Sequence, residues 1–239
     1  MRCLLLALIL FVPGLSASAQ VARTQQAQRQ LLEDVAREAA RRELGFEIRN
    51  TELLPGVTVG RYLDDTGQSE RLQDALSRAE IIGGARWLTA DVCQFHLQLD
   101  GRLVSDLLVG VARQGGPLRV DDVAKGSRAW FGRPFVATGT AIDPVALETL
   151  NPPASAAAVW RGVSRDARVR AIRAAHAAAV ASAGPAATAQ TPVTQLRFYA
   201  EASDACVEVE LLSPATGEAF FGTATVLRTP VRAGEARTD

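Results

Sequence analysis

Apolar residues recur at helical spacing in three segments of the chain. In each segment they fall three or four positions apart, which places them along one face of a helix. Glycines follow the first two segments, and a serine that can act as an N-cap precedes the third. The expected helices are residues 24–44 before Gly45, residues 69–81 before Gly83-Gly84, and residues 165–183 after Ser164.

Two apolar runs flank Asp100-Gly101 in the middle of the chain. An Asp-Gly pair between apolar runs is typical of a tight β-hairpin, because the turn needs positive φ at both positions. We therefore expect residues 85–99 and 102–112 to pair as antiparallel strands. Their buried face would consist of Phe95, Leu97, Leu99, Leu107, Val109 and Val111. Their solvent-exposed face would include Gln94, His96 and Gln98.

The remaining extended segments are shorter or bounded by turn residues. Residues 46–62 alternate loosely around Pro55-Gly56, which predicts strand, turn and strand. Asp143 followed by a proline predicts a short capped helix. The other expectations are a strand at 133–142, a loose segment at 184–194, and a second hairpin of 193–212 with 219–226.

The order of these elements predicts an α+β protein of two helix-plus-antiparallel-hairpin units. The two units resemble each other in the order of their elements. Two interpretations of this resemblance stay open: a degenerate duplication, or the recurrence of a common α+β arrangement. The expected organisation is a first unit at 20–113, a connecting region at 114–132, a second unit at 133–229 and a disordered tail at 230–239.

The N-terminus has the three parts of a secretory signal peptide. Arg2 precedes an apolar run at 4–12, and Ala17-Ser18-Ala19 provides the small residues that signal peptidase requires. We expect cleavage of residues 1–19 before Gln20 and a periplasmic or secreted mature chain; the alternative is a buried N-terminal helix. The run is shorter than the roughly 20 residues of a membrane span, and no later stretch reaches that length.

The charge balance argues against two classes of partner. The chain has 26 basic and 26 acidic residues, and removal of Arg2 leaves a small negative balance. Nucleic acids and anionic lipids are bound by concentrated positive charge. We therefore expect neither as the main partner.

Cys93 and Cys206 remain after the expected cleavage and leave two alternatives open. An oxidising compartment favours a disulfide between them. The strand phases point elsewhere, because Cys93 shares a face with buried residues whereas Cys206 shares one with Glu208 and Glu210. The second alternative is therefore two separate thiols.

The chain has no motif of known catalytic, metal-binding or nucleotide-binding spacing. His96 and His176 are far apart and have no ligand-type neighbours. We expect no metal and no cofactor, and an enzymatic role is not favoured. Trp130, Phe131 and Trp160 lie in connecting regions, where large rings either pack under loops or contact a partner.

Three segments resemble one protein family. The first is the Ala-rich segment 34–44 (DVAREAARREL), the second is 81–87 with the strand 92–99, and the third is 135–141 (FVATGTA). They are similar to small bacterial envelope lipoproteins, which are related to the N-terminal domain of a flagellar assembly protein. The lipid-bearing cysteine of those lipoproteins is missing here. The resemblance implies an envelope structural or assembly role without catalytic residues.

Two functional hypotheses follow. The first is an exported, non-enzymatic envelope protein that acts in protein binding or assembly, through sheet edges that the hairpins leave open. Its partner would be another envelope protein. The alternative is a periplasmic hydrolase or small-ligand-binding protein with a cleft between the two units.

Overall fold

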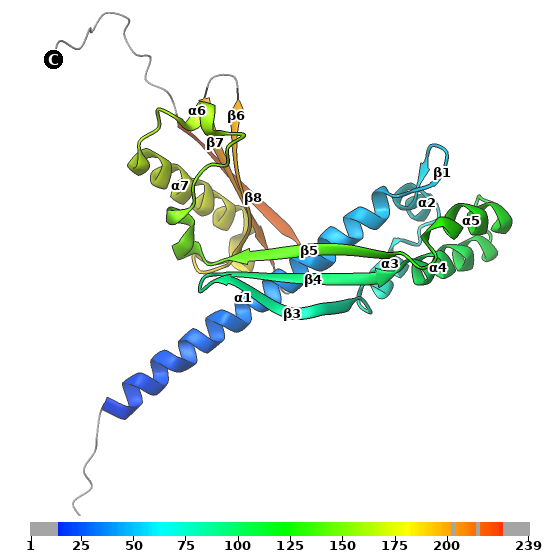
Figure 1. The fold of residues 1–239 in the computed structure, drawn as a ribbon, viewed down its shortest axis with the longest axis horizontal. Coiled ribbons are helices and arrows are strands. Elements are labelled where there is room, and N and C mark those ends of the chain that lie inside the picture. The colour runs from blue at the N-terminus through cyan, green and yellow to red at the C-terminus, as the bar shows by residue number, and fades with distance from the viewer. Residues whose placement is uncertain (1–13, 202–203, 214–215, 227–239) are drawn as a thin grey trace, which may run out of the picture.

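The computed structural model describes residues 14–201, 204–213 and 216–226, with side chains from residue 21 onward. It contains one six-stranded antiparallel sheet in the order β3-β4-β5-β6-β7-β8, a two-stranded β1-β2 hairpin, and helices (Figure 1). The expected α+β class is confirmed. Residues 1–13, which hold most of the expected signal peptide, and residues 230–239, the expected tail, lie outside the described residues.

The first helix, α1 (Gly14–Asn50), contains the expected segment but does not end at Gly45. Its buried line continues past the glycine, because Leu44 and Ile48 both face the core. Gly45 is itself buried, and a Cβ there would lie 2.9 Å from Leu76 Cδ1. The glycine therefore lets another helix approach closely and does not stop this one.

The region after α1 is more helical than its alternation suggests. The expected turn at Pro55-Gly56 is confirmed, since it joins two short strands. The residues after the turn form a helix, because the Thr58 hydroxyl accepts a hydrogen bond from the Arg61 amide and caps it. The elements here are β1 (Glu52–Leu54), β2 (Val57–Thr58), α2 (Val59–Asp65) and α3 (Ser69–Leu76).

The glycine pair at 83–84 interrupts a strand and does not end a helix. It lies within β3 (Glu80–Thr89), which pairs with β4 (Val92–Asp100) across a two-residue turn. Gly83 and Gly84 have φ of 73° and 78°, and the register shifts between Ile82 and Arg86. The expected helix at 69–81 is therefore shorter, and the glycines form a β-bulge.

The hairpin expected at Asp100-Gly101 is wrong. Asp100 ends β4, and its carboxylate accepts a hydrogen bond from the Arg102 amide, which caps helix α4 (Gly101–Arg113). Val104, Leu108 and Val111 are buried at helical spacing. The strand that pairs with β4 on its second side is β5 (Pro134–Ile142), and the expected buried face of Phe95, Leu97 and Leu99 is confirmed.

The region between α4 and β6 contains short helices and one long one. The expected strand at 133–142, the Asp143 cap and the helix after Ser164 are confirmed. The connecting region contains a further helix. The elements are α5 (Val120–Ser127), η1 (Arg128–Trp130), η2 (Pro144–Thr149), α6 (Ala157–Trp160), α7 (Arg165–Ala183) and η3 (Gly184–Ala186).

The C-terminal strands form a three-stranded meander. The expected strand at 193–212 is two strands, β6 (Val193–Glu201) and β7 (Asp204–Leu212), which pair with each other. The expected pairing of 204–212 with β8 (Ala219–Val226) is confirmed. The apolar pattern of residues 193–212 did not predict the break between these two strands.

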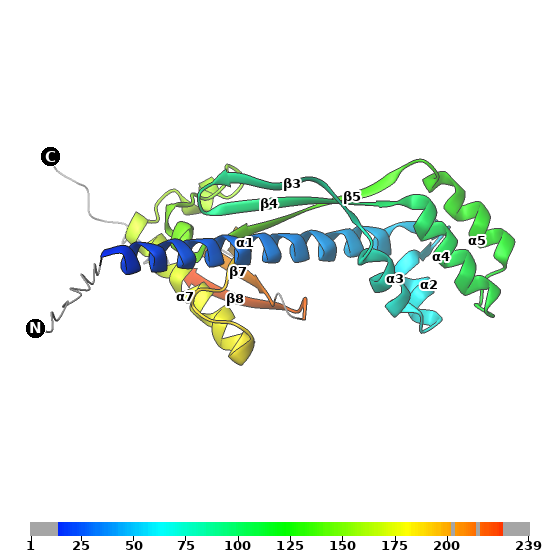
Figure 2. The ribbon, with the colours of Figure 1, turned by 90° about the horizontal axis from the view of Figure 1, so that it is seen from below.

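Each half of the sheet packs against its own helix. The first unit is α1 with β3, β4 and β5, and the second is α7 with β6, β7 and β8. Each has a separate core cluster of buried apolar side chains. In the side view, α1 lies between β3–β5 and the group formed by β7, β8 and α7 (Figure 2).

Each unit has the same close contact between a glycine of its third strand and its own helix. A Cβ on Gly139 of β5 would overlap backbone atoms of Ala36 and Ala40 in α1, and a Cβ on Gly222 of β8 would overlap those of Ala175 and Ala179 in α7. In both helices the two alanines are four residues apart. This matched geometry favours the duplication interpretation.

Candidate functional site

A groove opens where the two halves of the sheet diverge. β5 pairs with β4 at nine positions but with β6 at one only, Ile142 with Val193. Beyond that pair the second meander turns away from the first (Figure 1). The groove has a volume of about 510 Å³ and is lined by Ala39, Arg42, Glu43, Phe46, Thr138, Gly139, Thr140, Thr194, Gln195, Arg197 and Glu210.

An ion pair crosses this inter-unit groove. Arg42 of α1 donates to Glu210 of β7 through Nη1 to Oε1 at 2.6 Å and through Nη2 to Oε2 at 3.5 Å. The Glu210 side chain is only 11% exposed, and the Thr194 hydroxyl donates to its Oε1 at 2.9 Å. Because a buried carboxylate needs such partners, this contact fixes α1 against the second meander.

The groove also contains a large exposed ring. Phe46 is 63% exposed, although it belongs to a helix whose other apolar residues are mostly buried. It also lines a second groove of about 360 Å³, on the side of α3 and Gly217. Exposed aromatic and arginine side chains at the centre of a concave surface are typical of binding hot spots.

The edge of β5 is unpaired along the groove. From Pro134 to Ala141 the strand pairs with no described strand on the β6 side, and Thr138, Gly139 and Thr140 line the groove. An unpaired strand edge presents backbone donors and acceptors that can pair with another chain. The groove therefore combines an open edge with the side chains of α1.

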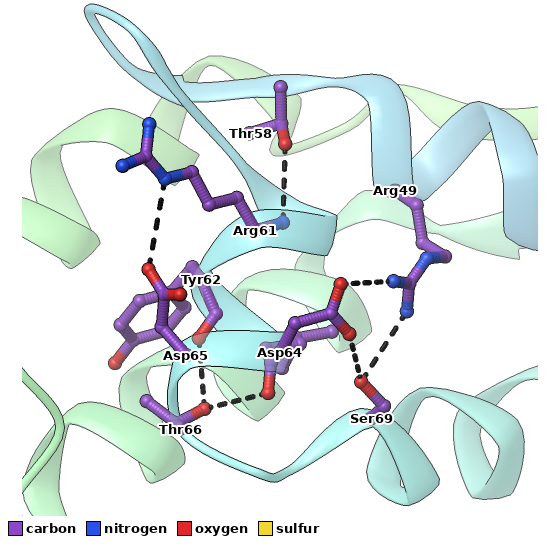
Figure 3. Close-up of polar contacts among 9 residues, drawn as sticks. Arg49, Thr58, Arg61, Tyr62, Asp64, Asp65, Thr66 and Ser69 are labelled. Carbon is purple, nitrogen blue, oxygen red and sulfur yellow. Dashed lines mark hydrogen bonds and ion pairs between the residues drawn. The ribbon is translucent and has the colours of Figure 1, made fainter.

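A second polar cluster joins α1 to the α2–α3 turn (Figure 3). Arg49 Nη2 donates to Asp64 Oδ2 at 2.6 Å, and the Ser69 hydroxyl donates to Asp64 Oδ1 at 2.7 Å. Hydrogen bonds from Arg49 and Ser69 lower the pKa of Asp64. All of these contacts link the ends of neighbouring helices, so we assign this cluster a structural role.

The three aromatic candidates have different environments. Trp130 is half-buried, and its ring packs edge-on against Phe135 at a centroid distance of 5.8 Å. Phe131 is exposed, so its role as a partner contact stays a prediction. Trp160 is only 5% exposed and packs edge-on against Phe198 in the second core. Of the two alternatives for Trp160, packing or partner contact, the structure has packing, because the short helix α6 turns the ring inward.

Cys93 and Cys206 are both free and buried in the structure, as two separate thiols. Cys93 lies in the first core, next to α1. Cys206 lies on the opposite face of β7 from Val207 and Val209, next to the Thr225 hydroxyl.

We expect neither thiol to react with a water-soluble thiol reagent in the folded mature chain at pH 8. Burial raises the pKa of Cys93 to about 11, so about one molecule in a thousand carries the thiolate at that pH. Intact-mass measurement after labelling, with and without denaturant, tests this expectation. Labelling of the denatured chain only after prior reduction would contradict it.

The histidines remain apart in the structure. His96 lies on the outer face of β4 and shares a hydrogen bond of 2.8 Å with the Thr138 hydroxyl. Burial lowers the pKa of His176, which contacts the backbone of Thr191. Within the described ranges, no group of three or more His, Cys, Asp or Glu side chains is placed to hold a metal ion. Over the same residues, no helix combines the length and apolar character needed to cross a bilayer.

No pattern in the sequence predicted Arg42, Phe46 or Thr194 as site residues. Arg42 and Glu210 lie 168 positions apart, and no local pattern links them. Phe46 was assigned to a strand, which concealed its exposure on α1. Comparison with protein-family models, curated proteins and solved structures finds no match.

Proposed function

We propose that this chain is an exported, non-enzymatic envelope protein that binds an extended segment of another protein in the inter-unit groove. The observation that carries the proposal is the divergence of β5 and β6 after a single pair. It leaves a strand edge open beside a groove that contains Arg42 and the exposed ring of Phe46. When an extended peptide adds to a sheet, backbone hydrogen bonds provide affinity and side-chain pockets provide specificity.

The outer edge at β3 is less suited to such binding. Its glycine bulge shifts the register between Ile82 and Arg86, so no long regular edge is available. Bulges of this kind protect edge strands from unwanted pairing. The groove edge at β5 has a regular register with β4 throughout.

Filling the groove is expected to remove partner binding. Gln195 lines the groove and belongs neither to the Arg42–Glu210 ion pair nor to the second core cluster, so Gln195→Trp would block the space with little loss of core packing. In affinity capture from a cell-envelope extract, quantified by mass spectrometry, we expect partner recovery to fall at least about tenfold, which corresponds to about 1.4 kcal/mol.

Thr223→Trp is the matched control, because Thr223 is exposed on the other outer edge strand, β8. It should leave capture unchanged. Equal capture by wild type and Gln195→Trp would reject the groove as the binding site. Loss with Thr223→Trp alone would assign binding to the edge of β8.

The groove also favours a second candidate function, the binding of a small polar ligand. Its volume of about 510 Å³ lies within the usual range of ligand pockets, and most of its lining side chains are polar or charged. Under this alternative, a small molecule would copurify with the wild-type chain and be lost from Gln195→Trp, and no protein would be captured.

A further inference from the structure

The charges that line the inter-unit groove are paired with one exception. Arg42 pairs with Glu210, and Arg197 Nη1 lies 3.6 Å from Glu208 Oε1. Glu43 lines the groove, is exposed, and has no ion pair with any described residue. The groove therefore presents one uncompensated charge, and that charge is negative.

Glu43 stands beside the exposed ring of Phe46. The two residues are three positions apart on α1, so their side chains are neighbours on one face of the helix. A carboxylate next to an aromatic face attracts a guanidinium or ammonium group through an ion pair and a cation–π contact. The chain already uses such ring contacts internally, because Arg29 lies over Trp87 at 5.4 Å and Arg37 lies over Phe95 at 5.1 Å.

We infer that the groove selects a basic side chain, Lys or Arg, on the extended segment that it binds. This inference rests on the proposed function and specifies the chemistry of its ligand. The segment pairs with the edge of β5, and its basic side chain reaches across the groove to Glu43 and Phe46. Arg42 does not repel that group strongly, since Glu210 neutralises it at 2.6 Å.

Selection from a phage-displayed library of random heptapeptides on the immobilised mature chain tests the inference. We expect peptides selected by the wild-type chain to be enriched in Lys or Arg at one position. For a synthetic selected peptide, Glu43→Lys should weaken binding at least about tenfold, because it replaces an attraction by a repulsion. Phe46→Ala should weaken binding about fivefold.

Asp121→Lys is the control for the change of charge. Asp121 is an exposed carboxylate of α5, a helix that contributes no residue to the groove and lies at the far end of the molecule from the second meander (Figure 1). The same change of charge there should alter peptide affinity by less than about threefold, because exposed charges at a distance are screened by salt. A library selection on Glu43→Lys should in turn favour Asp or Glu at the position that was basic.

The outcomes distinguish a failure of the basic-residue preference from a failure of peptide binding in the groove. Peptides that bind the wild type but not Gln195→Trp, and that show no basic preference, would overturn the inference and leave the proposed function standing. Enrichment of no peptide, or of the same peptides on Gln195→Trp, would overturn both. An equal effect of Glu43→Lys and Asp121→Lys would also overturn the inference, because it would show a general field effect.

Discussion

Gly139→Ala is expected to lower the free energy of unfolding by about 3 kcal/mol or more. A Cβ on Gly139 would lie 2.7 Å from the carbonyl carbon of Ala39 and would overlap backbone atoms of Ala36 and Ala40. Backbone cannot move aside as a side chain can, so α1 would have to separate from β5. That separation would also loosen the packing of Ala137 and Ala141 beneath the helix.

Urea unfolding followed by circular dichroism measures this effect. Gly162→Ala is the matched control, because a Cβ at Gly162 has no atom within 4 Å. We expect the control to change the free energy of unfolding by less than about 0.5 kcal/mol. Similar unfolding midpoints for the two variants would show that α1 and β5 are less closely packed than described.

Gly222→Ala is expected to destabilise the second unit while the first stays folded. A Cβ there would lie 2.9 Å from the carbonyl carbon of Ala178 and would overlap backbone atoms of Ala175 and Ala179 in α7. The two units have separate core clusters and share a single strand pair. The loss of about 3 kcal/mol should therefore fall mainly on one cluster.

Native-state hydrogen exchange distinguishes local from global loss. Amides of α7, β7 and β8 should exchange about a hundredfold faster in Gly222→Ala, as expected for a loss of about 3 kcal/mol, whereas those of α1 and β4 should change little. Gly139→Ala should show the reverse pattern. Uniform acceleration across both units would mean that they unfold together.

The elements that could be predicted from the sequence are those whose ends are set by neighbouring residues, such as helix caps. The helix after Ser164 begins and ends as expected, because the serine hydroxyl accepts from the Ala167 amide and Gly184 follows the last turn at positive φ. Asp143 caps its short helix in the same way. Caps depend on neighbouring residues only, so the sequence contains all that is needed to recognise them.

Asp100-Gly101 shows why similar local signals can mislead. An aspartate before a glycine fits both a hairpin turn and the start of a helix, and a short apolar run does not distinguish the two. The tertiary structure makes the choice, because a Cβ on Gly101 would lie 2.7 Å from the Arg133 carbonyl oxygen. The glycine is required by close packing beside η1 and β5, which lies outside any local pattern.

The candidate site depends on tertiary structure even more. The groove exists because β5 and β6 separate after Ile142, and the strand patterns on either side contain no sign of that separation. Arg42 and Glu210 appear in sequence as ordinary charged residues of a helix and a strand. Their role arises only when α1 is placed beside β7.

One strand pair, Ile142 with Val193, joins the two meanders within the sheet. A full ladder of hydrogen bonds would hold the two meanders at one angle, whereas one pair resists bending weakly. The hydrogen bond from Arg42 to Glu210, at 2.6 Å, is a second link, which joins α1 to β7 across the groove. We therefore expect a molecule that enters between the strands to lengthen the Arg42–Glu210 hydrogen bond and to change the angle between the two meanders.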